Sequence, residues 1–215
     1  MGAAKWIAAG LGIAAAGAAI AYARYSDTEQ PDYTVVKDDG DFQLRDYDPI
    51  IVAEVTHSGN RNEASSASFR RLAAYIFAQD RPRGGEEIAM TSPVLQERVA
   101  RDEKIAMTSP VLQDQTATDQ WRMRFVMPAK YTLETLPPAP SDITLTKVPG
   151  RRMATLRFSG NARASDIEAM EAELIRWIAA QKLTSVGDFE YAFYDAPMVP
   201  GPLRRNEVMI EVAAD

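Results

Sequence analysis

Two stretches that echo each other decide the fold: Ala53-Glu-Val-Thr-His-Ser-Gly-Asn60 and Ala154-Thr-Leu-Arg-Phe-Ser-Gly-Asn161. Each alternates between the two faces of a half-buried strand, and each ends in the same Ser-Gly-Asn. Apolar residues then recur every three or four positions, which predicts amphipathic helices over residues 63–79 and 165–181. A strand followed by a helix therefore occurs once in each half of the chain.

The order of elements around the two copies is also the same. Strands are predicted over residues 42–47, 88–90, 94–99, 111–113 and 121–127 in the first half, and over 143–148, 189–194 and 207–212 in the second. Consecutive strands joined by short turns pair antiparallel. The predicted fold class is therefore α+β: duplicated β-β-α-β-β halves that form a distorted antiparallel β-barrel flanked by two helices. A ligand groove is expected between the helices and the sheet, and Ser165 with Glu168 predicts a capping box.

A shorter repeat lies inside the first half. Ile88-Ala-Met-Thr-Ser-Pro-Val-Leu-Gln96 recurs letter for letter over residues 105–113, seventeen positions further on. One interpretation is a tandem duplication that lengthened a surface loop. The other is that Met90 and Met107 line a pocket, because Met is a flexible, polarisable side chain suited to a large flat ligand.

Composition excludes several classes of function. The chain has no Cys, which removes disulfides, thiolate metal sites and Cys nucleophiles. Its one histidine, His57, excludes His-rich zinc sites and leaves Ser nucleophiles with a single possible imidazole base. The net charge of −6 argues against a nucleic-acid surface, which is normally basic. We therefore expect a binding protein, not an enzyme, with no nucleic acid among its partners.

The N-terminal segment is apolar. Residues 6–23 carry no charge and lie between Lys5 and Arg24, which suits the apolar region of a signal peptide or a short transmembrane helix. Residues 1–25 are therefore predicted to be a signal peptide or membrane anchor, residues 26–32 a linker, and residues 33–213 the domain. A buried or disordered Ala-rich helix is the alternative. The protein is expected to be membrane-anchored through this segment, or periplasmic and exported.

Four motifs point to a family. They are Arg45-x-Tyr47, Lys104-Ile-Ala-Met-Thr-Ser-Pro-Val111, Trp121-Arg-Met-Arg-Phe-Val-Met-Pro128 with Tyr131-Thr-Leu133 after it, and Arg205-Asn-Glu-Val208. Together they resemble the SOUL/haem-binding protein family across the whole domain. The resemblance implies a twisted antiparallel barrel with two flanking helices. It also implies non-covalent binding of haem or another porphyrin in a hydrophobic groove, without turnover.

One position departs from the family pattern. Some members look to a His directly before the Tyr of the Arg-x-Tyr strand as an axial iron ligand, and here that position is Asp46. Other members hold haem by apolar contact alone. The departure therefore weakens axial ligation at this strand and leaves haem binding itself open.

The candidate cofactor-binding residues each have a plain structural alternative. His57 is the candidate iron ligand, although a strand-end His is more often hydrogen-bonded. Thioether contacts are expected from four methionines, with ordinary core packing as the alternative: Met90, Met107, Met123 and Met127. Tyr47 and Tyr131 are expected to stack on the macrocycle, with simple half-burial as the alternative. Arg70 is expected to pair with a propionate, with a solvated helix face as the alternative.

The function predicted is carriage or buffering of haem or a related tetrapyrrole. Two alternatives stay open: a module that binds another amphipathic small molecule, and a protein-interaction module that uses the charged residues 97–104. The sequence leaves the oligomeric state open.

Overall fold

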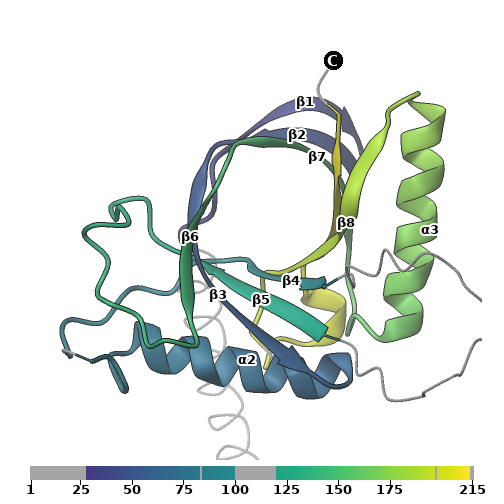
Figure 1. Cartoon of the computed structure of the whole chain (residues 1–215). Helices are drawn as coiled ribbons and strands as arrows, with labels where there is room; N and C mark the ends of the chain where they lie inside the picture. The colour runs from purple at the N-terminus through teal and green to yellow at the C-terminus, as the bar shows by residue number, and fades with distance from the viewer. Residues whose placement is uncertain (1–27, 83, 100–119, 197, 214–215) are drawn as a thin grey trace, which may run out of the picture.

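The computed structural model describes residues 28–82, 84–99, 120–196 and 198–213. Within these residues the strands form one antiparallel nine-stranded sheet in the order β1-β2-β7-β9-β8-β4-β5-β3-β6. The strands are β1 (Tyr33–Asp39), β2 (Phe42–Tyr47), β3 (Ile50–Ser58), β4 (Val94–Arg98), β5 (Gln120–Val126), β6 (Thr144–Val148), β7 (Arg151–Phe158), β8 (Ser185–Phe193) and β9 (Asn206–Val212). The sheet curls into a half-barrel with β1 and β6 at its edges (Figure 1).

Two long helices lie on the outside of the curl (Figure 1). Helix α2 (Arg61–Ile76) packs on β3 and β5, and helix α3 (Ala164–Ala180) packs on β7 and β9. A short 3-10 helix, η1 (Gly201–Leu203), precedes β9. The α+β class and the two flanking helices are therefore confirmed, whereas the barrel is an open, curled sheet.

The strand pairings of the two halves correspond. Strand β3 pairs with β5 and β6, and β7 pairs with β9 and β2; β4 and β8 pair with each other in the middle. Strand β1, an edge strand with mostly exposed side chains, has no counterpart and was not predicted. That the two halves are copies of one ancestral unit stays a prediction.

Two local predictions were wrong. Residues 88–90 form no strand, because this segment bonds to its surroundings instead: Ile88 N–H donates to the carbonyl of Ile76 at 2.8 Å. Helix α3 begins at Ala164, before the predicted capping box of Ser165 and Glu168. The Asp166 carboxylate accepts from Arg163 N–H at 3.1 Å and closes the first turn in their place.

Several predictions concern residues outside the described ranges. They are the apolar N-terminal segment, the second copy of the short repeat with Met107, the strand over 111–113, and most of the charged stretch 97–104. Among the helices that the structure does describe, none has the length and apolar character required to cross a bilayer. Membrane anchoring or export through residues 1–25 stays a prediction.

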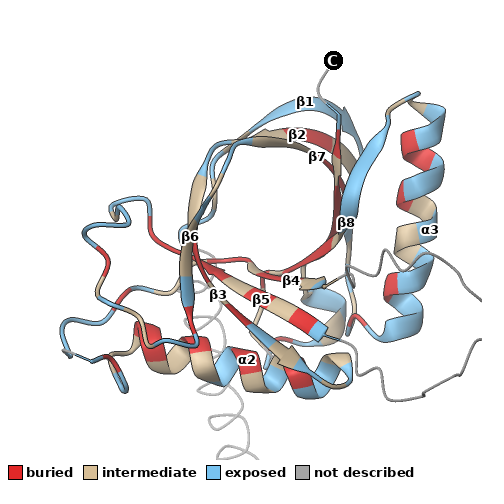
Figure 2. Cartoon of the chain, in the orientation of Figure 1, coloured by how far each residue is buried: buried red, intermediate tan, exposed pale blue. Residues whose placement is uncertain are grey.

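The two faces of the sheet differ in chemistry. The outer face meets the helices in two apolar clusters, one under α3 around Leu174 and Val208 and one under α2 around Leu72 and Met123. Burial accordingly follows the sides of the helices that touch the sheet (Figure 2). The helices thus close the outer face, which is where the sequence predicted a ligand groove. The inner face has a smaller apolar cluster that includes Leu95 and Met209.

A buried carboxylate joins the strands of the inner face. Glu207 on β9 is 0% exposed and accepts bonds from Arg45 on β2 at 2.8 and 3.1 Å. It also accepts from Arg205 at 2.8 Å and from the Tyr194 hydroxyl at 2.8 Å. Burial by itself would raise the pKa of Glu207, but the bonds and charges of Arg45 and Arg205 outweigh burial and hold that pKa below its ordinary value.

Replacing this carboxylate should destabilise the fold strongly. Glu207→Gln leaves two arginines on the inner face without their anion, so we expect a loss of about 3 kcal/mol or more in the free energy of unfolding. The measurement is urea denaturation of both proteins. A group with a depressed pKa stabilises the fold above its unfolded pKa and loses that contribution as pH falls. The difference in the free energy of unfolding between wild type and Glu207→Gln should therefore become smaller below pH 4.5. A difference under about 1 kcal/mol at neutral pH would contradict this role.

Candidate functional site

Two segments meet in space at one end of the half-barrel: the Phe-Val-Met-Pro family motif, and the first copy of the repeat, which has the same Met-Thr-Ser-Pro letters as the family motif over residues 104–111. That second family motif lies outside the described residues. The segment Met90-Thr-Ser-Pro93 enters β4 beside the end of β5, where Phe125-Val-Met-Pro128 leaves the sheet. The Thr91 hydroxyl donates to the carbonyl of Val126, which joins the two segments directly. A pocket of about 330 Å³ lies at this end. We call it the motif pocket, defined by Ile50, Ile51, Thr91, Val126, Met127 and Tyr131.

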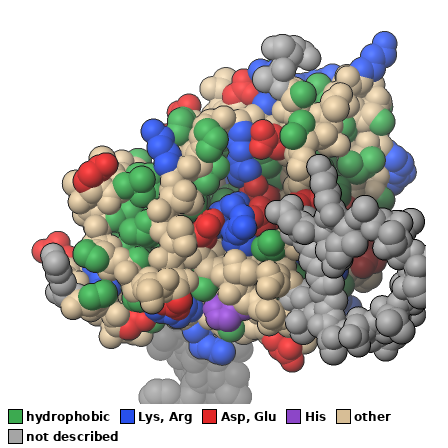
Figure 3. Space-filling view, viewed as in Figure 1, with side chains coloured by type: hydrophobic (Ala, Val, Ile, Leu, Met, Phe, Trp, Pro, Cys, Tyr) green, Lys and Arg blue, Asp and Glu red, His purple; other side chains and the backbone are tan. Residues whose placement is uncertain are grey.

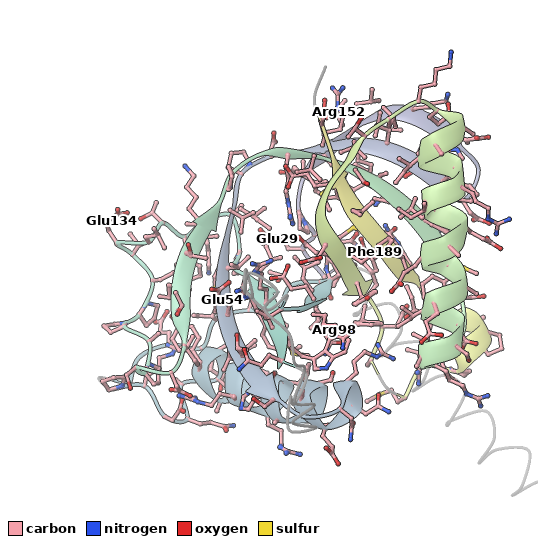
Figure 4. All side chains as sticks on the ribbon, turned by 45° about the vertical axis from the view of Figure 1, so that its right-hand side comes forward. Glu29, Glu54, Arg98, Glu134, Arg152 and Phe189 are labelled. Carbon is pink, nitrogen blue, oxygen red and sulfur yellow. The ribbon has the colours of Figure 1, made fainter. Side chains whose placement is uncertain are left out.

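Local backbone chemistry explains why a pocket forms at this place. Met127 N–H makes a last bond to the carbonyl of Ile51 at 2.8 Å. Pro128 has no N–H to continue the ladder, and the chain turns so that Tyr131 N–H donates to the Pro128 carbonyl at 3.0 Å. The loop that follows projects away from the half-barrel, as the position of Glu134 shows (Figure 4).

The N-terminal end of the domain forms part of the pocket wall. The Glu29 carboxylate accepts from Ala129 N–H at 2.6 Å, and the Glu29 carbonyl accepts from Ser92 N–H at 2.9 Å. These bonds tie residues 28–32 across both motif segments. The polar lining consists mainly of Glu29, Asp32, Asp48 and Lys147. The pocket thus combines an apolar floor with a rim that carries both signs of charge.

Three of the predicted site residues come together here. Met127 and Tyr131 line the motif pocket, and Met90 packs against the same apolar cluster beside them. Lys130 lies next to the pocket, with its ammonium 5.0 Å from the centre of the Tyr131 ring. Met123, four residues before Met127, is 2% exposed beneath α2. Its surroundings are those of a packing residue.

The other predicted site residues that the structure describes do not line the motif pocket. Nδ1 of the His57 ring and the Ser68 hydroxyl of α2 share a hydrogen bond of 2.9 Å. His57 lies six residues along β3 from Ile51, about 20 Å away at strand spacing. Arg70 is exposed on α2. Tyr47 lies on the inner face, where its hydroxyl accepts from Arg45 at 2.9 Å. Burial raises the pKa of Tyr47 to about 12, so this phenol stays protonated at neutral pH.

The inner face also carries a charge network that the sequence did not reveal. Arg124 on β5 reaches Glu54 at 3.0 Å and Glu97 at 3.1 Å, and Arg122 bonds Glu97 at 2.8 Å. Glu190 lies directly opposite Glu97 on the neighbouring strand. Viewed down the curl, acidic and basic side chains occupy the middle of the molecule (Figure 3), and Glu54 points into the half-barrel (Figure 4). The five residues come from four different strands, so their spacing along the chain gives no signal.

This network has an electrostatic cost at its centre. Burial raises the pKa of Glu97 above its ordinary value, because Arg124 offsets the loss of water only in part and Glu190 adds a like charge. Like charges directly opposite on paired strands are destabilising. Glu97 therefore keeps a proton in the folded state at a pH where the unfolded chain has already lost it.

Removing the Glu97 charge should change the pH dependence of stability. As pH rises above 4.5, the unfolded chain loses the Glu97 proton first, so this residue lowers the free energy of unfolding with rising pH. Because Glu97→Gln does not titrate, its free energy of unfolding should rise relative to wild type between pH 4.5 and neutrality. Urea denaturation across this range measures the difference. Glu168→Gln, an exposed charge loss on α3, is the control; a Glu97→Gln difference that is constant or falls with pH would contradict the assignment.

Solved structures of other proteins share the fold. A hydrolase from Listeria innocua is 11% identical with a TM-score of 0.52, covering 80% of this chain and 91% of that one. The C-terminal domain of EcmrR is 10% identical with a TM-score of 0.56, covering 85% and 99%. EcmrR in a complex with DNA is 9% identical with a TM-score of 0.57, covering 81% and 57%. At these identities the likeness shows the fold alone.

The comparison by sequence identifies the family. No curated protein matches the chain. The family described as SOUL heme-binding protein matches residues 28–211, which include the strands, both helices and the motif pocket. The chain therefore belongs to the SOUL heme-binding protein family.

Proposed function

We propose that the protein binds haem or a related tetrapyrrole non-covalently in the motif pocket, and carries or buffers it without transforming it. The observation that carries the proposal is the convergence on one pocket of the Phe-Val-Met-Pro family motif and the first copy of the Met-Thr-Ser-Pro repeat, joined by the bond from Thr91 to Val126. Family membership supports the ligand class. The lining of the pocket, apolar side chains with a few polar groups, supports binding of a small molecule.

The pocket residues fit a flat amphipathic ligand. Its volume of about 330 Å³ is near the lower end of the range for small-molecule pockets, so a macrocycle would rest on the apolar floor with one edge in solvent. Ile50, Ile51 and Met127 would contact the ring. Lys147 on the rim and Lys130 beside it would pair with propionates.

Haem would supply an iron that accepts axial ligands, and Met and Tyr are among the side chains that serve. Met127 and Tyr131 are the residues of those types that line the pocket. His57 is engaged with Ser68 at the other end of β3. We therefore propose that apolar contact, not a histidine–iron bond, provides most of the affinity.

One observation favours a second candidate, a binding module for an amphipathic cation. Three carboxylates, Glu29, Asp32 and Asp48, line the pocket against one ammonium, Lys147. Such a rim attracts positive charge and repels the propionates of a tetrapyrrole. The same apolar floor would serve either ligand.

Hemin titration of the full chain, followed by Soret absorbance, tests the proposal. Wild type should bind one equivalent, and Lys147→Glu should raise the Kd roughly fivefold to tenfold, because a contact worth about 1 kcal/mol is replaced by a repulsion. Lys37→Glu makes the same charge change on β1, away from the pocket lining, and should leave the Kd unchanged. His57→Ala should also bind as wild type does.

Each other outcome assigns the ligand or the site differently. Loss of saturable binding in His57→Ala would move the site to the α2 side of β3. If the Soret absorbance shows no saturable shift at tens of micromolar hemin while a lipophilic aromatic cation binds saturably, the amphipathic cation replaces the tetrapyrrole as the proposed ligand.

A further inference from the structure

A second cavity lies beside the motif pocket, on the inner face of the half-barrel. Its volume of about 20 Å³ leaves room for roughly one water molecule, so it is too small for an organic ligand in this structure. We call it the inner pocket. It is defined by side chains of the apolar cluster on the inner face: Tyr47, Leu95, Met153, Tyr194 and Met209.

The two pockets share part of their walls. Pro31, Asp48 and Ile50 line both cavities. Asp48 and Ile50 lie where β2 passes into β3, whereas Pro31 lies in the segment before β1. We call this segment, residues 28–32, the strap. It contributes a part of the shared wall that does not belong to the sheet.

Hydrogen bonds near its two ends hold the strap in place. The bonds of Glu29 to Ala129 and Ser92 fix one end, and at the other the Asp32 carbonyl accepts from Asp48 N–H at 3.2 Å. In Figure 4 Glu29 lies within the outline of the half-barrel, between β3 and β8. Each residue of the strap is exposed or half-buried. A segment with few buried apolar contacts opens at a small cost in free energy, so the strap is easier to move than the buried strands around it.

We propose that the motif pocket and the inner pocket are two parts of one ligand groove, which the strap divides and which opens when the strap moves. The inference rests on the proposed function and identifies where the inner edge of the tetrapyrrole ring would lie. The floor of the motif pocket includes Ile50, and the same side chain lines the inner pocket. A ring wider than the motif pocket would continue past Ile50 to Met153 and Met209.

The inner pocket suits the apolar edge of a macrocycle. Met153 and Met209 are flexible and polarisable side chains, and Tyr47 offers an aromatic ring. The Tyr194 hydroxyl, at the same pocket, already donates to Glu207. The groups that a ligand would meet here are therefore thioethers and aromatic rings.

Charged side chains set the orientation of the ring. Arg151 also lines the inner pocket, but both oxygens of the Glu190 carboxylate already accept bonds from it, one of them at 2.8 Å. Lys147 lines the motif pocket on the other side of the strap. The propionates would therefore stay beside Lys147 and solvent, and the apolar edge of the ring would point inward.

Methyl NMR of the methionines tests which pockets the ligand reaches. The full chain, labelled with carbon-13 at the methionine methyl groups, is titrated with metal-free protoporphyrin, whose ring current shifts the resonances of nearby methyl groups. Met127 reports on the motif pocket, and Met153 and Met209 report on the inner pocket. We expect these three resonances to shift with one common Kd. Met170 on α3 is the control and should not shift.

The other outcomes of this titration separate the groove from the proposed function. A shift of Met127 without shifts of Met153 and Met209 would overturn the joined groove and leave the proposed function intact. If protoporphyrin shifts none of the three, the proposed function fails, and the amphipathic cation rhodamine 6G is titrated instead. Joint shifts of Met127 and Met209 would then support the groove for another ligand, whereas an unchanged Met209 would overturn it.

Two substitutions of Glu29 test the strap itself. Glu29→Gln removes the charge but keeps an oxygen that can accept from Ala129 N–H, whereas Glu29→Ala removes both. If the strap has to move, Glu29→Ala should bind the same ligand roughly threefold to tenfold more tightly than Glu29→Gln, because a larger fraction of the protein is open before binding. Equal or weaker binding by Glu29→Ala would show that the strap is a fixed wall and would overturn the proposal.

Discussion

The buried carboxylate of Glu207 is the constraint on which the inner face depends. A charge with no exposure is tolerated only when it is paired and hydrogen-bonded, and here two arginines and a tyrosine supply the partners. Arg45 reaches Glu207 across β7, so the ion pair joins β2 to β9. This gives a physical meaning to two of the family motifs. Arg45-x-Tyr47 and Arg205-Asn-Glu-Val208 are the two sides of one buried ion cluster, and their first role is to hold the curl.

The chemistry of the two faces bears on where the proposed ligand would bind. The inside of the curl holds the Glu207 and Arg124 charge clusters together with a buried apolar cluster that includes Leu95 and Met209. The outer face is closed by α2 and α3. The motif pocket lies at the strand ends, where Pro128 follows β5 and where Ile50, Ile51 and Met127 supply apolar lining.

The sequence predicted the elements well and the site only in part. Strand alternation and helical periodicity are local signals, and they located both helices and most strands to within a few residues. Met123 and Met127 lie four residues apart in an alternating pattern, so they share a face, and both lie in the cluster under α2. Whether that face packs on a helix or lines a pocket depends on tertiary contacts, which alternation does not encode. His57 shows the same difficulty, because its partner Ser68 comes from a neighbouring element. The cluster of Glu54, Glu97 and Arg124 depends on the order of strands in the sheet, which no local pattern specifies.

Glu97 on the central strand β4 combines two opposing effects. Its length lets it reach Arg122 and Arg124, while its burial and the facing Glu190 raise its pKa. A shorter acid at this position would be farther from the arginines and less constrained by them. Natural sequences normally favour one structure because each local preference agrees with the global fold. At Glu97 the ion pairs and the burial act in opposite directions, so this strand carries a charge whose unfavourable contribution to stability grows as pH rises.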